Sequence, residues 1–204
     1  MKKYAVMYEP GDIINLAGTK FVVLDVERRG NLPDSLFVLS CDTVGESVFG
    51  RNNNYAISDL RSEVDKWLEE MGKKGLNLDR IIPRNIDLTT LDGCIEYNTM
   101  KVKAAPLTLD EARKYAYKIP RVYRWYWLAT GWSGHTEGGK NNSLGIGSNN
   151  EWQFGHCTDS HGIRPAMKVS ASILDESEDA GLGYVTIEDM LNEIYRRVYL
   201  KEES

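Results

Sequence analysis

The sequence has no long hydrophobic run. None reaches the roughly 18 consecutive apolar residues that a membrane-spanning helix requires. The basic pair Lys2-Lys3 is followed by Glu9, Pro10 and Asp12 before the apolar segment of a secretory signal could form. We therefore expect a protein without a signal peptide or membrane segment, located in the cytoplasm or in a phage particle assembled there.

Cysteine is also scarce. The three thiols, Cys41, Cys94 and Cys157, are too few and too scattered for a disulfide framework, and no pair has the spacing of a Cys-x-x-Cys motif. We expect three reduced thiols in a reducing compartment.

Basic charge is not in excess either. The chain has 25 Lys and Arg against 30 Asp and Glu, a net charge of −5. Nine acidic and three basic residues lie between Ser172 and Ser204, which gives this tail a charge of −6 and leaves the body nearly neutral. Because a phosphate backbone requires a basic surface, direct nucleic-acid binding is disfavoured. The acidic tail is compatible with a basic protein partner, with mimicry of nucleic acid or with a plain solvated surface.

What the sequence does contain is a series of short strand and helix signals. Runs of β-branched and aromatic residues predict strands over residues 12–16, 21–26 and 36–40, separated by turn formers at 17–19 and 29–31. The second and third of these strands are expected to form an antiparallel ribbon with a fairly long loop.

Two helices are predicted in the middle of the chain. The first is capped by Ser58 and ended by Gly72 and Gly75, and its apolar face consists of Leu60, Val64, Trp67, Leu68 and Met71. The second begins with a capping box between Thr108 and Glu111 and ends at Pro120, with an apolar face of Leu109, Ala112, Ala116 and Ile119.

A third helix is predicted near the C-terminus, with Thr186 as its cap. Its apolar stripe consists of Ile187, Met190, Leu191, Ile194, Tyr195 and Val198. This stripe packs either on its own domain or on a second subunit, so a homo-oligomer formed through this helix remains open.

The segment from Arg121 to Val169 is rich in Gly, Asn, Ser and aromatic residues. Strands are predicted over residues 125–128, 143–147, 151–154 and 163–169, with a turn at Ser148-Asn149-Asn150.

The order of five motifs resembles a known group of proteins. These motifs are Asn54–Arg61 before Trp67-Leu68, then Ala105–Glu111, Tyr126–Thr130 and Gly162–Met167. Together they resemble a largely uncharacterised family of gut Gram-positive bacteria and their prophages, with a Trp-Leu motif followed by Gly-Val/Ile-Arg-Pro-Ala. That family is distantly similar to the C-type-lectin superfold, which includes formylglycine-generating enzymes and retroelement-diversified phage receptor-binding proteins.

The resemblance, which covers about residues 12 to 170, implies an α+β fold of the C-type-lectin type. We expect this domain over residues 1–171, with a small antiparallel sheet, two flanking helices and long irregular loops. An acidic linker and a helix over 172–204 follow. The implied function is that of a non-catalytic binding protein encoded by a phage or prophage, in the cytoplasm or in the virion.

The resemblance implies no cofactor. The Glu-Pro-Asn and Trp-Asn-Asp motifs of calcium-binding C-type lectins are absent. The paired cysteines of formylglycine-generating enzymes do not carry over, because Cys41 and Cys94 lie far from Cys157 in the sequence.

Three residues are predicted to hold the scaffold together. Arg164 lies between Gly162 and Pro165, where a buried guanidinium with five donors can hold irregular loops through backbone carbonyls. Trp127 and Trp67 are predicted to bury their large rings.

The residues between Trp132 and His156 carry the predicted binding surface. Aromatic faces beside amide groups suit a glycan or a protein ligand. The candidates are Trp132, His135, Asn141, Asn142, Asn149, Asn150, Trp152, Phe154 and His156. The alternative is that the aromatics are core residues and the Asn and Gly residues only form turns. A second cluster, Asn52-Asn53-Asn54, is interpreted as a plain loop.

Two other functions stay open. One is a cysteine-dependent enzyme around Cys157, with His156 and His161 nearby; the same residues match no strong zinc pattern. The other is an intracellular phage-type inhibitor of a host nuclease or defence enzyme, which would act through the acidic residues 175–204.

Overall fold

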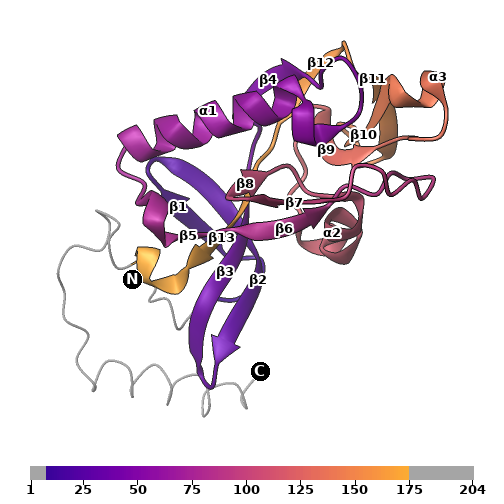
Figure 1. Cartoon of the computed structure of the whole chain (residues 1–204). Helices are drawn as coiled ribbons and strands as arrows, with labels where there is room; N and C mark the ends of the chain where they lie inside the picture. Colours follow the sequence, from indigo (N-terminus) through magenta and orange to yellow (C-terminus); the bar gives the residue numbers. More distant parts are fainter. Residues whose placement is uncertain (1–7, 175–204) are drawn as a thin grey trace, which may run out of the picture.

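The protein is an α+β structure built on three β-sheets (Figure 1). A computed structural model describes residues 8–174. Within them no helix is long and apolar enough to cross a membrane. The α+β class expected from the sequence is thereby confirmed.

The first large sheet, sheet A, contains the N-terminal strands. Its strands in spatial order are β1 (Ile13–Leu16), β2 (Thr19–Arg29), β3 (Leu32–Ser40), β13 (Ala166–Ser170) and β5 (Ile81–Ile82), and β8 (Ala104–Ala105) also pairs with β13. The antiparallel ribbon of β2 and β3 is confirmed. Its predicted long loop is wrong, because both strands extend to a tight turn at Gly30, whose φ of 64° favours glycine.

The second large sheet, sheet B, contains most of the predicted binding segment. Its spatial order is β11 (Trp152–His156), β10 (Asn142–Ile146), β9 (Tyr126–Gly131), β12 (Ser160–Ile163) and β4 (Gly45–Val48). β12 runs parallel to β9, so the expectation of a single small antiparallel sheet needs correction. β6 (Arg84–Asp87) and β7 (Thr99–Val102) form a separate two-stranded sheet.

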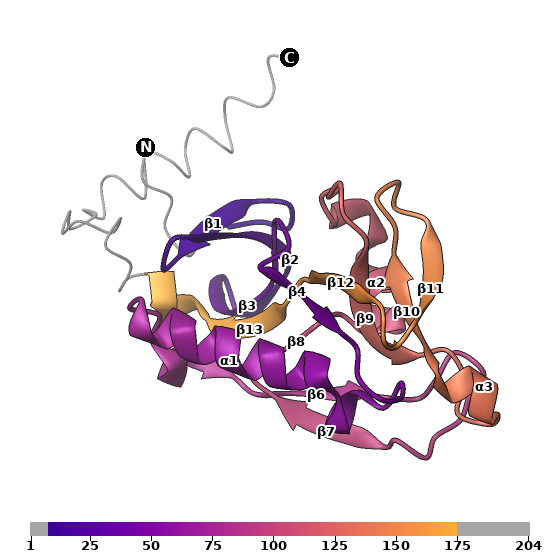
Figure 2. The same cartoon turned by 90° about the horizontal axis from the view of Figure 1, so that it is seen from above.

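Helix α1 (Asp59–Lys73) covers one face of sheet A, as seen from above in Figure 2. It begins at Ser58, whose hydroxyl accepts a hydrogen bond from the Arg61 amide as predicted. Its buried residues, Leu60, Val64, Leu68 and Met71, pack against Phe21 and Val23 of β2 in the first hydrophobic core. The helix contains Gly72 and ends one residue later.

Helix α2 (Leu109–Lys114) packs in a second hydrophobic core with Val22 and Leu24 of β2 and Leu144 of β10. The capping box of Thr108 and Glu111 is confirmed. The predicted length is wrong: a 3₁₀ turn, η4 (Ala116–Lys118), follows the helix and leaves Ala116 exposed. Because the two cores cover both faces of β2, residues 21–24 are all buried without the alternation of a half-exposed strand.

The chain crosses from sheet B to sheet A at Arg164 and Pro165. The single strand predicted over residues 163–169 is therefore wrong, because β12 ends at Ile163 and β13 begins at Ala166. Pro165 has no backbone N–H to donate to a strand ladder, and its carbonyl accepts from Ser40.

Three shorter helices complete the structure: the 3₁₀ turns η2 (Tyr55–Ile57) and η3 (Leu78–Arg80), and α3 (Glu137–Lys140). A last 3₁₀ turn, η5 (Ala171–Leu174), buries Ile173 and Leu174 in the first core, so the expected domain boundary after residue 171 falls inside an ordered element. The predicted C-terminal helix lies outside the described residues.

Candidate functional site

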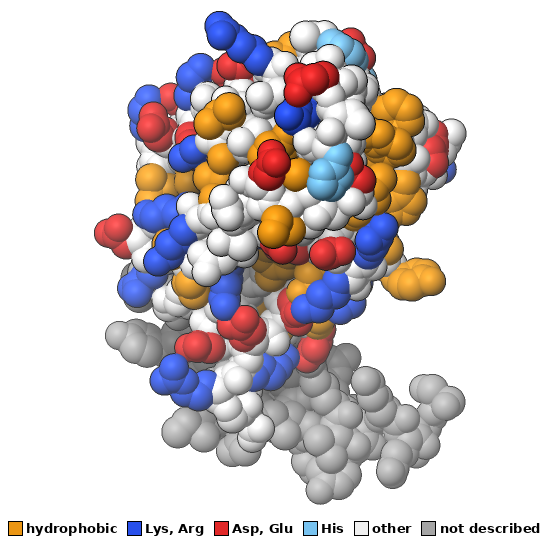
Figure 3. Space-filling model, turned by 45° about the vertical axis from the view of Figure 1, so that its right-hand side comes forward, with side chains coloured by type: hydrophobic (Ala, Val, Ile, Leu, Met, Phe, Trp, Pro, Cys, Tyr) orange, Lys and Arg blue, Asp and Glu red, His pale blue; other side chains and the backbone are white. Residues whose placement is uncertain are grey.

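The β10–β11 hairpin brings together most of the predicted ligand-binding residues. Trp152 and Phe154 lie two residues apart on β11 and point to the same face, with exposed fractions of 46% and 54%. The half-buried Trp132, from the loop after β9, packs its ring on Phe154 with the centroids 4.4 Å apart. Hydrophobic side chains and histidines are seen on the same upper part of the surface in Figure 3.

The aromatic face of β11 continues a buried apolar face of β10. Phe154 pairs with Leu144, and Trp152 pairs with Ile146. Both β10 residues are almost fully buried in the second hydrophobic core. The apolar surface therefore runs from the core outward and ends, uncovered, at the last strand of sheet B.

β11 is an edge strand, and the hydrogen-bond pattern shows which of its backbone groups are open. The Gly147 amide donates to Glu151 and the Cys157 amide donates to Asn141, at the two ends of the ladder. Because hydrogen-bonded pairs alternate along an antiparallel ladder, the backbone N–H and C=O groups of Trp152 and Phe154 point away from β10. Within residues 8–174 no further strand pairs with this edge.

Among the described residues, this edge carries none of the usual features that prevent strands from pairing. The five residues of β11 include no Lys, Asp, Glu or Pro. Natural edge strands are commonly protected by such residues, by bulges or by a covering element. The β10–β11 register is also regular over five pairs, without a bulge.

The predicted asparagines mostly support the hairpin rather than project from it. Asn142 donates from its side-chain amide to the Gly138 carbonyl, and the side-chain oxygen of Asn149 accepts from Arg121. Asn150 adopts a φ of 63° in the turn before β11, a conformation that asparagine tolerates well. Asn141 is exposed next to β10, and its backbone contributes to the ladder.

The two predicted histidines are both exposed. His156 is the last residue of β11, exposed, with Nδ1 2.7 Å from the Thr158 hydroxyl. His135 is exposed in the loop before α3, and its backbone amide donates to Ser133. Neither ring makes an aromatic contact with Trp132 or Phe154 in the described structure.

The opposite face of sheet B is closed by an aromatic stack. The ring of Trp125 lies against His161, with the centroids 3.9 Å apart, and against Trp127. The Trp125 indole N–H donates to Gln153, and its ring occupies the space that a Cβ of Gly145 would need. Burial lowers the pKa of His161. The two exposed aromatic residues of β11, Trp152 and Phe154, lie on the other side, with Trp132.

The three predicted scaffold residues lie inside the molecule. Arg164 is buried and donates to the carbonyls of Ser40, Cys41 and Pro120, with its guanidinium over the Tyr126 ring. Trp127 is fully buried, and its indole N–H donates to the Ser47 carbonyl. Trp67 is half-buried on α1, near Phe21 of β2.

Asn53 is a residue whose importance the sequence did not reveal. The interpretation of residues 52–54 as a plain loop is wrong, because Asn53 is fully buried. Its amide nitrogen lies within hydrogen-bond distance of the carbonyls of Ser133, Gly139 and Asn142, and its oxygen accepts from Tyr97. It thereby fixes the segment that leads into the hairpin.

Cys157 lies directly after β11 but is fully buried. Burial, together with the charge of Asp159, raises the pKa of its thiol to about 12. A nucleophilic cysteine requires a lowered pKa and access to solvent. Within the described residues, no group of three or more His, Cys, Asp or Glu residues is arranged to hold a metal ion.

Comparison with known proteins gives no match: no family model, no curated protein and no solved structure matches this chain.

Proposed function

We propose that this protein is a non-catalytic binding protein that recognises an extended segment of a partner protein at the outer edge of β11. In this proposal the scaffold is of the C-type-lectin-like kind and the gene belongs to a phage or prophage. The proposal rests on the sequence resemblance for the scaffold and source, and on the β11 edge for the mode of binding.

The observation that carries the proposal is that Trp152 and Phe154 expose both their backbone polar groups and their aromatic side chains. Their backbone N–H and C=O groups point away from β10, and their aromatic side chains are about half exposed. An added strand satisfies such backbone groups, while its alternate side chains cover the aromatic face; this is recognition by β-strand addition.

The partner segment is expected to be apolar at every second position. Its side chains would lie beside Trp152 and Phe154, and the absence of charge on β11 disfavours a strongly charged segment. A glycan fits less well, because the Trp132 ring is already covered on one side by Phe154 and the amides of Asn142 and Asn149 are engaged locally.

The test is a selection of linear 12-residue peptides from a random library on the full-length protein, followed by titration of synthetic peptides. We expect the selected peptides to share alternating apolar residues. The variant Phe154→Ala should weaken their binding roughly 30-fold, the loss of one aromatic anchor. Phe154→Pro removes the outward amide as well, and should weaken binding a further threefold to tenfold relative to Phe154→Ala.

A control is Tyr117→Ala, which removes a fully exposed aromatic ring from η4 and should leave peptide binding unchanged. The proposal is wrong if the peptides bind Phe154→Ala as tightly as the wild type. It is also wrong if no peptide is enriched and a glycan array gives the only binding that depends on Phe154.

The two alternative functions differ in how the structure bears on them. The acidic segment 175–204, which would act in an inhibitor of a host nuclease or defence enzyme, lies outside the described residues. The enzyme alternative requires a reactive thiolate at Cys157, and the burial and raised pKa of this thiol argue against it.

A further inference from the structure

A pocket of about 290 Å³ lies on the face of sheet A beside α2, away from the β11 edge. Its floor is a row of cross-strand neighbours, Asp25 of β2, Phe37 of β3 and Lys168 of β13. Arg84 of β6 and Tyr115, the residue after α2, form its walls. This volume offers space for a ligand of roughly ten non-hydrogen atoms.

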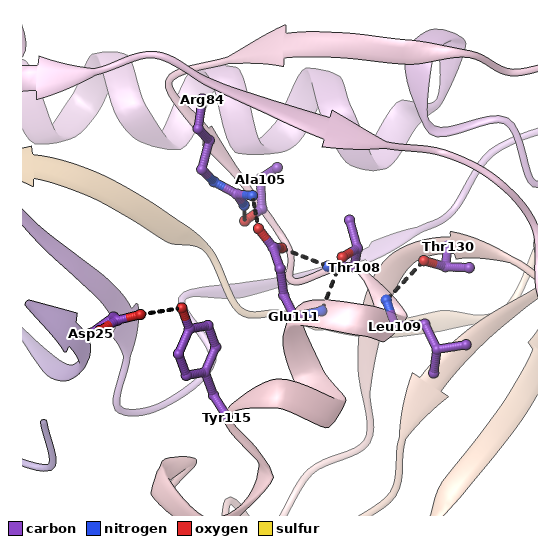
Figure 4. A network of polar contacts seen from close by, with 8 residues as sticks. All are labelled: Asp25, Arg84, Ala105, Thr108, Leu109, Glu111, Tyr115 and Thr130. Atoms are coloured by element: carbon purple, nitrogen blue, oxygen red, sulfur yellow. Dashed lines mark hydrogen bonds and ion pairs between the residues drawn. The ribbon is translucent and has the colours of Figure 1, made fainter. Parts of the chain in front are cut away.

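The pocket is lined by charges of both signs in equal number. Asp25 accepts from the Tyr115 hydroxyl at 2.7 Å and pairs with Lys114 at 3.2 Å. Glu27 pairs with Lys168 at 2.6 Å. The third pair joins Glu111 of α2 to Arg84; Figure 4 shows this pair and the hydrogen bond from Tyr115 to Asp25. The lining is therefore neutral overall but strongly polar.

Arg84 is unusual among these residues because it is buried and incompletely paired. Its side chain is only 9% exposed, and its guanidinium lies over the Phe37 ring. One terminal nitrogen pairs with Glu111, but Nε has no hydrogen-bond partner among the described residues. Nε is itself shielded from solvent, so a ligand in the pocket can reach the guanidinium only at its terminal nitrogens. The second of these makes only a 3.5 Å contact with the Ala105 carbonyl, and a bound carboxylate would be a better acceptor for it.

We propose that this pocket binds a small zwitterion with the chemistry of a free α-amino acid. Its carboxylate accepts from Arg84, its ammonium lies against Asp25 and Glu27, and its body covers the rings of Phe37 and Tyr115. A ligand with a net charge would unbalance a neutral lining, whereas a zwitterion can exchange partners with the existing ion pairs without adding charge. The pocket is independent of the peptide site proposed above.

The experiment is calorimetric titration of the full-length protein with single probes: glycine, L-leucine, L-phenylalanine and L-glutamate, and then acetate, methylammonium and inorganic phosphate. We expect at least one amino acid to bind and neither acetate nor methylammonium to bind at the same concentration. The proposal is overturned if no amino acid binds, or if phosphate or acetate binds as tightly as the best amino acid.

Two variants locate the binding. Glu27→Gln removes a carboxylate that is 61% exposed, so the fold should persist, and it should weaken amino-acid binding about tenfold. Arg84→Lys keeps the charge but removes the planar pair of terminal nitrogens, and should weaken binding by a similar factor. The matched control Glu63→Gln breaks an exposed ion pair with Lys66 on α1 and should change nothing. Unchanged binding in Glu27→Gln and in a folded Arg84→Lys would place the ligand elsewhere and refute the proposal.

Discussion

The Phe154 ring lies against the Trp132 ring with the centroids 4.4 Å apart, although Phe154 lies in the middle of β11 and Trp132 follows the end of β9. Phe154 nevertheless remains more than half exposed. Phe154 thus has a partner within the protein and still presents a free face. An aromatic pair of this kind holds a side chain in one orientation at a surface, which lowers the entropy cost of binding there.

Replacing Phe154 should separate binding from stability. Phe154→Ser removes an exposed ring from an edge strand, so the free energy of unfolding should fall by no more than about 1 kcal/mol. Urea denaturation measures this value, and Leu144→Ser, which alters the buried neighbour of Phe154 on β10, serves as the contrast with an expected loss of about 3 kcal/mol. A large loss of stability in Phe154→Ser would show that this ring is a core residue.

Arg164 should be essential to the junction between the two large sheets. Arg164→Met leaves the buried carbonyls of Ser40 and Pro120 without their donor, and we expect a loss of about 3 kcal/mol in the free energy of unfolding. Arg124→Met, which removes an exposed arginine paired with Glu46, should cost less than about 1 kcal/mol. Equal effects of the two substitutions would contradict this account.

Asn53 and its neighbour Asn52 offer a matched comparison. Asn53→Asp removes the amide that faces three carbonyls and buries a charge, so we expect a loss of about 3 kcal/mol or failure to fold. Asn52 accepts a hydrogen bond from the Asn54 amide, which an aspartate accepts equally well, so Asn52→Asp should be nearly neutral. Thermal unfolding followed by circular dichroism distinguishes them, and a stable Asn53→Asp variant would refute the role assigned to this side chain.

The three cysteines should differ in reactivity. At pH 8 only about one in 10⁴ thiols with a pKa of about 12 is deprotonated. Because the thiolate is the reactive form, Cys157 should resist alkylation by iodoacetamide in the folded protein. Cys94 is also buried, whereas Cys41 is half-buried and should be labelled first. Mass spectrometry of digested protein gives the order of labelling. Rapid labelling of Cys157 would revive the hypothesis of a cysteine-dependent enzyme.

Local signals in the sequence predicted the elements better than their arrangement. The caps at Ser58 and Thr108 depend on residues three positions away, so they were visible in the sequence. The end of β12 at Ile163 could not be seen in the sequence. Residues 163–169 have the composition of one strand, and only the pairing shows that Ile163 belongs to sheet B and residues 166–169 to sheet A. The side chain of Asn53 forms its hydrogen bonds with residues at least 80 positions away in the sequence, except for Tyr97, which is 44 positions away.

For the candidate site too, the sequence indicated the residues but not their arrangement in the fold. The sequence singled out Trp152 and Phe154 as aromatic residues between turn formers. It could not show that β11 is the last strand of its sheet. That follows from the pairing of β10 with β9 and of β9 with β12, whereas the β10–β11 hairpin is local. It also could not show that Asn142 and Asn149 are engaged locally.

The open edge of β11 can be tested residue by residue by amide hydrogen exchange measured by NMR, first in the free protein and then with a selected peptide bound. In the free protein the amides of Trp152 and Phe154 should exchange fast while that of Gln153, which bonds to β10, exchanges slowly. Peptide binding should slow the exchange of Trp152 and Phe154 and leave Gln153 unchanged. Slow exchange of Trp152 and Phe154 in the free protein, or no change on binding, would contradict recognition by strand addition at this edge.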